Sequence, residues 1–99
     1  MHEVVRFVFP EPGCREGIEA DISLAIFSAE CVYGRPRTRL EVSYLVDDEG
    51  GRCVLRVRGD AGQAALQVFI GLCGERFGED GFQVDRREGL GVQPEMGPR

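Results

Sequence analysis

Hydrophobic and polar residues alternate in four short segments of this sequence, and hydrophobic residues recur with helical spacing in two longer ones. Alternation with a period of two is typical of strands that bury one face, whereas a spacing of three or four residues is typical of amphipathic helices. The pattern predicts strands at 4–9, 38–46, 52–58 and 82–86, and helices at 18–33 and 60–77.

Residues that interrupt regular structure separate these segments. Gly34 suits the C-terminal cap of the first helix, and Pro36 prevents that helix from continuing. The acidic, glycine-rich stretch 47–51 has the composition of a hairpin turn. Asp60 and Gln63 have the spacing of a capping box, so they predict the start of the second helix.

The resulting order, β-α-β-β-α-β, predicts an α+β sandwich of the ferredoxin-like class. In this arrangement two helices cover one face of a four-stranded antiparallel sheet, with the first and third strands in its centre. We expect one domain over residues 1–87 and a flexible tail over the glycine- and proline-rich residues 88–99. Proteins of many functions share this architecture, so it predicts no activity by itself.

The first predicted helix has two apolar faces. One face contains Ile18, Ile22, Ala25, Ile26, Ala29 and Tyr33. The nearly opposite face contains Ala20, Leu24, Phe27 and Cys31. A helix that covers a single sheet needs only one apolar stripe, so the second face predicts a contact with something other than the sheet.

The second predicted helix presents a strip of small residues on the side away from the sheet. This strip comprises Ala64, Gln67, Gly71 and Gly74. Glycine inside a helix costs about 1 kcal/mol relative to alanine, but an outward strip of small residues lets another backbone approach closely. We therefore predict a partner interface formed by this strip together with Leu24, Phe27 and Cys31. The alternative is that the two helices pack sideways and use the extra apolar surface on each other.

The predicted outer face of the sheet is rich in arginine. It carries Arg6, Arg39, Arg56, Arg58 and Arg87 against Glu41 and Asp85, a balance of +3. A basic surface on an acidic protein suits an anionic ligand, and we assign that ligand to Arg6, Arg39, Arg56 and Arg58. RNA is not expected, because the outward positions of the central strands hold no aromatic ring on which a base could stack.

Two other interpretations of the outer face remain open. Its apolar residues could pack against a second subunit to form a dimeric α/β barrel. These residues are Val4, Val8, Leu45 and Val54. Alternatively, the face is solvated and its charges form weak ion pairs.

The cysteines offer one candidate for chemistry. Cys14 lies beside Arg15 before the first helix, where a thiol pKa is lowered, so Cys14 is a candidate reactive thiol; the alternative is an ordinary loop cysteine. Cys31, Cys53 and Cys73 lie on apolar faces, where small core residues are expected. With widely spaced cysteines and a single histidine, we expect no metal and no cofactor.

Charge and hydropathy narrow the functional classes. The chain of 99 residues has a net charge of −5, so a general attraction to nucleic acid or to anionic membranes is not expected. The first residues lack the pattern of a secretory signal and no apolar run reaches membrane-spanning length, which predicts a cytoplasmic protein. Our leading hypothesis is a non-enzymatic subunit that oligomerises or binds a protein partner. The alternative is a small anionic-ligand-binding protein, or a modest enzyme, that uses the arginine face.

Overall fold

The computed structural model describes residues 2–10, 15–47 and 51–89. Its four strands are β1 (His2–Val8), β2 (Val42–Val46), β3 (Arg52–Val57) and β4 (Gln83–Gly89). They form one sheet in the order β2-β3-β1-β4, and each neighbouring pair is antiparallel. The central strands are therefore β1 and β3, and the edges are β2 and β4.

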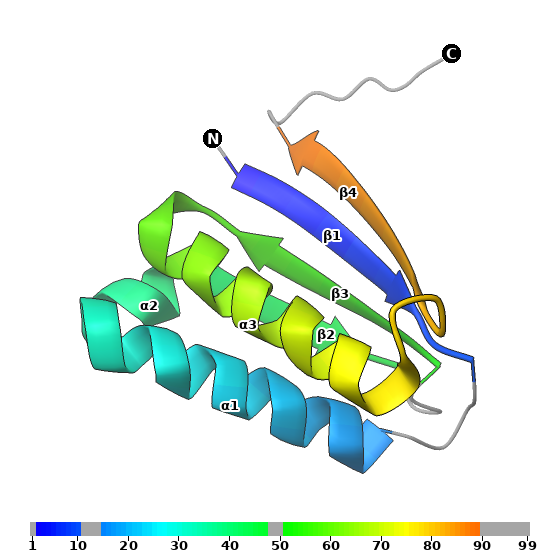
Figure 1. Cartoon of the computed structure of the whole chain (residues 1–99). Helices are drawn as coiled ribbons and strands as arrows, with labels where there is room; N and C mark the ends of the chain where they lie inside the picture. Colours follow the sequence, from blue (N-terminus) through cyan, green and yellow to red (C-terminus); the bar gives the residue numbers. More distant parts are fainter. Residues whose placement is uncertain (1, 11–14, 48–50, 90–99) are drawn as a thin grey trace.

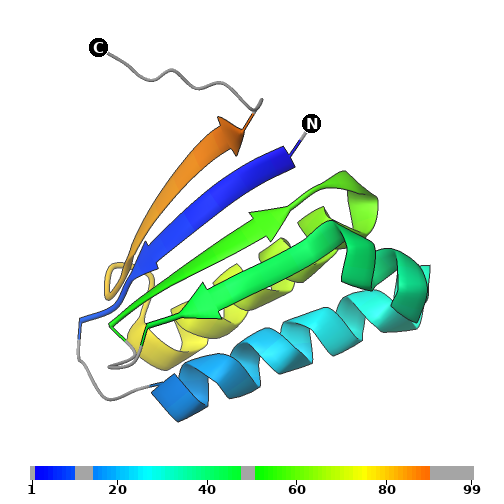
Figure 2. The same ribbon diagram turned by 180° about the vertical axis from the view of Figure 1, so that it is seen from behind.

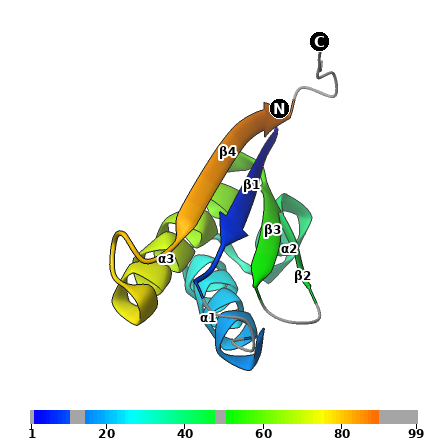
Figure 3. The same cartoon turned by 90° about the vertical axis from the view of Figure 1, so that its right-hand side faces the viewer.

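Three helices accompany the sheet: α1 (Arg15–Tyr33), α2 (Arg35–Glu41) and α3 (Gly59–Phe77). The two long helices, α1 and α3, lie side by side on one face of the sheet (Figure 1). No helix of the described residues covers the other face, as the views from behind and from the side show (Figures 2 and 3). The protein is thus an α+β domain with an open, four-stranded antiparallel sheet and three helices.

The core lies between the sheet and the two long helices. Alternate residues of the central strands, such as Phe7 and Leu55, point into it and are fully buried. The Phe7 ring meets the Phe69 ring of α3 edge to face, with 4.9 Å between the ring centroids. Because strand residues alternate between the two sides of a sheet, the neighbours of these buried residues point to the uncovered face.

The prediction of a strand over 38–46 was wrong in its first half. Residues Arg35–Glu41 form α2, and only Val42–Val46 form a strand. Pro36 lies in the first turn of α2, where its missing N–H is not needed, so it starts a helix here as well as ending α1. Thr38 is fully buried, and its hydroxyl donates a hydrogen bond to the Gly34 carbonyl at 2.9 Å.

The predicted capping box of the second helix was also wrong. Asp60 lies inside the first turn of α3 and makes no side-chain cap. The Glu41 carboxylate takes that role from α2, because its Oε1 accepts hydrogen bonds from the amides of Ala61 at 2.9 Å and Gly62 at 3.2 Å. Gln63 instead donates from Nε2 to Glu3 on β1 at 2.9 Å. Sequence spacing suggested a local cap, whereas the chain uses a distant one.

Other boundaries shifted by a few residues. The first helix begins at Arg15, three residues before its predicted start, and ends at Tyr33 as predicted. The last strand continues to Gly89. The remainder of the predicted tail, residues 90–99, lies outside the described residues, as does Cys14.

Candidate protein-interaction surfaces

The outer side of α1 exposes the apolar residues that the sequence pattern placed there. Ile18, Ile22 and Ala25 are buried against the sheet, whereas Leu24 is 50% exposed and Phe27 is 59% exposed. Cys31 is an exposed free thiol. The second apolar face of α1 is therefore open to solvent within this chain.

Sideways packing of α1 and α3 occurs, but it does not cover that face. Arg76 near the end of α3 donates from Nε to Asp21 of α1 at 2.8 Å, and it also reaches the Gly17 carbonyl. These contacts join the helices on the side that includes Asp21. Leu24 and Phe27 remain half exposed, so contact between the helices does not account for the apolar surplus of α1.

The small strip of α3 is open in its second half. A methyl group added at Gly71 or Gly74 would meet no atom within 4 Å. Gln67 and Gly71 are exposed, whereas Ala64 and Gly74 are half-buried. The strip thus leaves space for an approaching chain, and its role as an interface stays a prediction.

A groove between α1 and the edge strand β2 is a feature that the sequence did not reveal. It has a volume of about 510 Å³, and its apolar wall consists of Ile26, Phe27, Val42 and Tyr44. An ion pair between Glu30 of α1 and Arg39 of α2, at 3.5 Å, lies among the other lining residues. Tyr44 pairs with the buried Leu55 and so points to the core side of the sheet, but 41% of it is exposed because it lies at the edge of the helical layer.

Exposed apolar side chains concentrate on one flank of the molecule. Among the described residues, eight large hydrophobic residues are exposed. Six of them belong to α1, α2 or β2: Leu24, Phe27, Val32, Leu40, Tyr44 and Leu45. Single exposed apolar residues are ordinary on protein surfaces, but a concentration on one flank is typical of an interaction site. We call these three elements the apolar flank.

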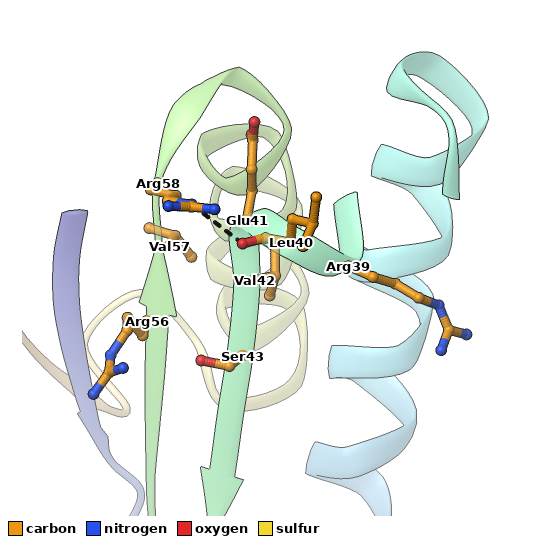
Figure 4. Close-up of a pocket in the computed structure, with 8 residues that line it drawn as sticks. All are labelled: Arg39, Leu40, Glu41, Val42, Ser43, Arg56, Val57 and Arg58. Atoms are coloured by element: carbon orange, nitrogen blue, oxygen red, sulfur yellow. Dashed lines mark hydrogen bonds between the residues drawn. The ribbon is translucent and has the colours of Figure 1, made fainter. Parts of the chain in front are cut away.

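The proposed anion site is only partly assembled. Arg56 and Arg58 line a hollow of about 250 Å³ where α2 meets β2 and β3 (Figure 4). Arg58 donates from Nε to the Leu40 carbonyl at 3.2 Å. Arg39 also lines this hollow from α2, but its guanidinium points away from this pair toward α1 (Figure 4) and forms an ion pair with Glu30. The prediction that Arg39 lies on the outer sheet face was therefore wrong, and the error follows from the misassigned start of β2.

Arg6 joins Arg56 on the outer face by register. Val4 pairs with Arg56 and Arg6 pairs with Val54, so the two arginines are diagonal neighbours on adjacent strands. Among the described residues, neither makes an ion pair. Arg87, also on this face, pairs with Asp85 at 3.3 Å. Arg6 and Arg56 thus form a small cationic pair that makes no described ion pair, although Asp85, the partner of Arg87, lies opposite Arg6 on β4.

Glu41 does not neutralise these arginines, because its carboxylate is committed elsewhere. It accepts from Arg37 at 3.1 Å as well as from the first turn of α3. Burial alone would raise the pKa of the Glu41 carboxyl, but the hydrogen bonds from Arg37 and the two amides outweigh it and lower that pKa. Glu41 therefore stays ionised as a structural link between α2 and α3.

The described cysteines differ sharply in their surroundings. Cys53 and Cys73 are buried as predicted, and burial raises the pKa of both thiols to about 12. Cys31 is exposed, so its assignment to the core was wrong, whereas its place on the outer face of α1 agrees with the helical wheel.

The described residues form neither a candidate metal site nor a membrane-spanning helix. No group of three or more His, Cys, Asp or Glu side chains in the described ranges could hold a metal ion. None of the described helices combines the length and hydrophobicity that crossing a membrane requires. Comparison with known proteins finds no matching family model and no matching curated protein.

Proposed function

We propose that this protein is a non-enzymatic module that works by assembling with other protein chains, including copies of itself. The single observation that carries this proposal is the apolar flank, which holds six of the eight large hydrophobic residues exposed in the described chain. Burying a large apolar side chain completely stabilises a complex by about 1.5–3 kcal/mol, so burying several exposed ones from these three elements would be a substantial driving force.

We also infer that the domain is of the ferredoxin-like class and works in the cytoplasm. The order β2-β3-β1-β4, with β1 and β3 central, supports the first inference, and α2 is then an addition between α1 and β2. The described cysteines Cys31, Cys53 and Cys73 are free thiols, which suits a reducing compartment.

Site-specific photo-crosslinking inside cells that express the protein tests this proposal. A photoreactive phenylalanine analogue replaces Phe27 on the apolar flank, and in a matched control it replaces Val84 on β4, which is 38% exposed. We expect a defined covalent adduct from position 27, either with this chain or with one other, identified by mass spectrometry, and none from position 84. Equal labelling at both positions, or no adduct at position 27, would contradict the proposal.

A second candidate function is the binding of a small anion on the outer sheet face. The observation in its favour is the diagonal pair Arg6 and Arg56, which make no described ion pair because the neighbouring Asp85 pairs with Arg87. Two copies packed face to face as a dimeric α/β barrel would bring these arginines together, so repulsion favours an anion over a second copy at this face.

Thermal-shift measurements with phosphorylated and carboxylated metabolites test this candidate. We expect a ligand of this class to raise the melting temperature of the wild type but not of Arg56→Ala. Arg87→Ala is the control, because Arg87 already pairs with Asp85. If no such compound stabilises the protein, or if Arg56→Ala responds like the wild type, this function is wrong.

A further inference from the structure

The two edges of the sheet are protected differently. On β4, Asp85, Arg86 and Arg87 place charges along the edge strand. The sequence of β2, VSYLV, contains no charge and no proline. Exposed edge strands are ready templates for pairing with another strand, and natural proteins usually block them with charges, prolines or bulges. By this criterion β4 is blocked and β2 is open.

The hydrogen bonds of β2 show which of its main-chain groups are free. At its two ends, the Asp47 amide donates to Arg52 at 3.1 Å, and Glu41 accepts from the Arg58 amide at 2.9 Å. Groups that face a partner strand alternate along an antiparallel strand, so Ser43 and Leu45 also face β3. The main-chain amides and carbonyls of Val42, Tyr44 and Val46 consequently point to the free edge.

Only one of these outward groups has a partner in the described chain. The Val42 amide donates to the Thr38 carbonyl, which ends α2. No hydrogen bond within the described residues uses the Tyr44 amide or carbonyl, the Val46 amide or the Val42 carbonyl. Free donors and acceptors therefore alternate along the open edge.

We propose that β2 pairs with β2 of a second copy about a two-fold axis at Tyr44, and this proposal rests on the assembly function proposed above. Antiparallel pairing centred on Tyr44 lets each Tyr44 amide donate to the other copy's Tyr44 carbonyl. The Val46 amide of each copy then donates to the Val42 carbonyl of the other. Pairing centred on Val42 would instead need the Val42 amide, which already donates to the Thr38 carbonyl.

Charge and position identify a second copy as the occupant. Because β2 carries no charge, two copies meet there without repulsion, and the nearby Glu30–Arg39 pair is neutral as a whole. The arginines of the outer face would repel each other in a face-to-face dimer. A two-fold axis perpendicular to the sheet keeps both helical layers on the same side and brings the groove between α1 and β2 of each copy next to that of the other. Phe27 and Tyr44 of both copies then share one apolar contact.

Amide hydrogen exchange measured by NMR at two protein concentrations tests the pairing directly. We expect the amides of Tyr44 and Val46 to be protected at high micromolar concentration and to exchange rapidly after dilution. The amides of Ser43 and Leu45 bond to β3 and stay protected at both concentrations. Exchange at Tyr44 and Val46 that does not depend on concentration would overturn the proposal.

A mixed sample of differently labelled chains provides the second measurement. Ser43 of one copy and Leu45 of the other form a non-hydrogen-bonded pair, whose Cα atoms lie about 4.5 Å apart in antiparallel sheets. We expect a contact between their Hα protons that is seen only between chains. Its absence from a sample that light scattering shows to be dimeric, at twice the chain mass of 10.9 kDa, would overturn the Tyr44-centred pairing.

Charge substitutions compare the two edges. Tyr44→Lys removes a tyrosine contact from each copy and places two like charges at the axis, so we expect the dissociation constant to rise by about 100-fold. Val84→Lys makes a matched change on β4 and should leave the dissociation constant unchanged. Equal effects of the two substitutions would contradict edge pairing. The exchange pattern of the wild type decides the matter if Tyr44→Lys does not fold.

Failure of the edge pairing is distinguishable from failure of the proposed function. A protein that is monomeric at high concentration but forms a defined adduct with another chain through position 27 overturns the β2 dimer and leaves the assembly function standing. A dimer without concentration-dependent protection of the Tyr44 amide would likewise overturn the β2 pairing and leave the assembly function standing. A monomer that forms no adduct contradicts both proposals.

Discussion

The position of each carboxylate decides which interactions depend on pH. Glu3 on β1 accepts hydrogen bonds from Arg86 at 2.7 Å and Gln63 at 2.9 Å. The hydrogen bonds from Arg86 and Gln63 lower the pKa of Glu3 below its usual 4.5, although burial opposes them. Glu3 therefore binds its proton less readily in the folded than in the unfolded chain, which links folding stability to pH.

We predict that Glu3→Gln weakens the protein at neutral pH but not in acid. Because the pKa of Glu3 is lower in the folded state, its stabilisation is complete above the unfolded value of 4.5 and is lost as pH falls through the folded value. At about pH 7, the substitution should cost about 1 kcal/mol of unfolding free energy, since the partner Arg86 is partly exposed.

Urea unfolding at about pH 7 and about pH 3 measures this difference. Glu79→Gln is the control, because Glu79 is exposed in the turn after α3. The stability gap between wild type and Glu3→Gln should narrow in acid, whereas the control should follow the wild type at both pH values. A gap that is unchanged or wider in acid would show that the Glu3 contacts do not stabilise the fold.

At the scale of elements, the sequence predicted what local patterns determine. Alternating residues correctly placed β1 and β3, and the helical wheel correctly left Leu24 and Phe27 outside the core. The start of β2 was missed because the apolar alternation at 38–46 hid a helix that Pro36 begins. That helix is held in place by Glu41, which reaches the first turn of α3 some twenty residues later.

The groove beside β2 was missed for the same reason. The groove is lined by α2 as well as by α1 and β2, so its shape depends on where α2 places the chain before β2. No local pattern reports such a placement, since it depends on contacts between segments far apart in sequence. The open edge was hidden by the same error, because the predicted strand 38–46 includes the charges of Arg39 and Glu41, whereas β2 itself carries none.

Substitution of Gly71 in α3 distinguishes whether the small residues of the strip serve the fold or an interface. Gly71 lies in the middle of the helix, is exposed, and has no atom near the place of an added methyl group. We predict that Gly71→Ala stabilises the fold by about 0.5–1 kcal/mol, because glycine costs more conformational entropy in a helix. Thermal and urea unfolding measure the gain.

Gly59→Ala is the matched control for this prediction. Gly59 begins the same helix at a φ of 67°, and an added methyl group there would collide with the Glu41 carboxylate, so the substitution should destabilise the protein. If Gly71→Ala stabilises the fold but weakens association, the strip is part of an interface. If stability falls, the strip is packed more closely than the structure indicates.

For the whole molecule, the arginine face and the apolar flank meet along the outer side of β2, where Leu45 and Arg56 line one pocket. The arginine pair lies on the uncovered sheet face, the apolar flank on α1, α2 and β2, and a charged strand on the opposite edge. An anion at Arg56 would lie beside Ser43 and Leu45 on the outer face, whereas a strand that pairs with β2 would use the main-chain groups of its free edge. In a dimer joined through β2, the two arginine faces would lie next to each other on the same side of the widened sheet.

The unequal edges also determine how far such an assembly can grow. A sheet with two open edges polymerises into a ribbon of indefinite length, because every added copy offers a new end. Here each copy has one open edge strand, β2, and the charges of β4 block pairing at the other edge. Growth through β2 therefore stops as a closed pair, so the chain can leave a strand uncapped without forming fibres.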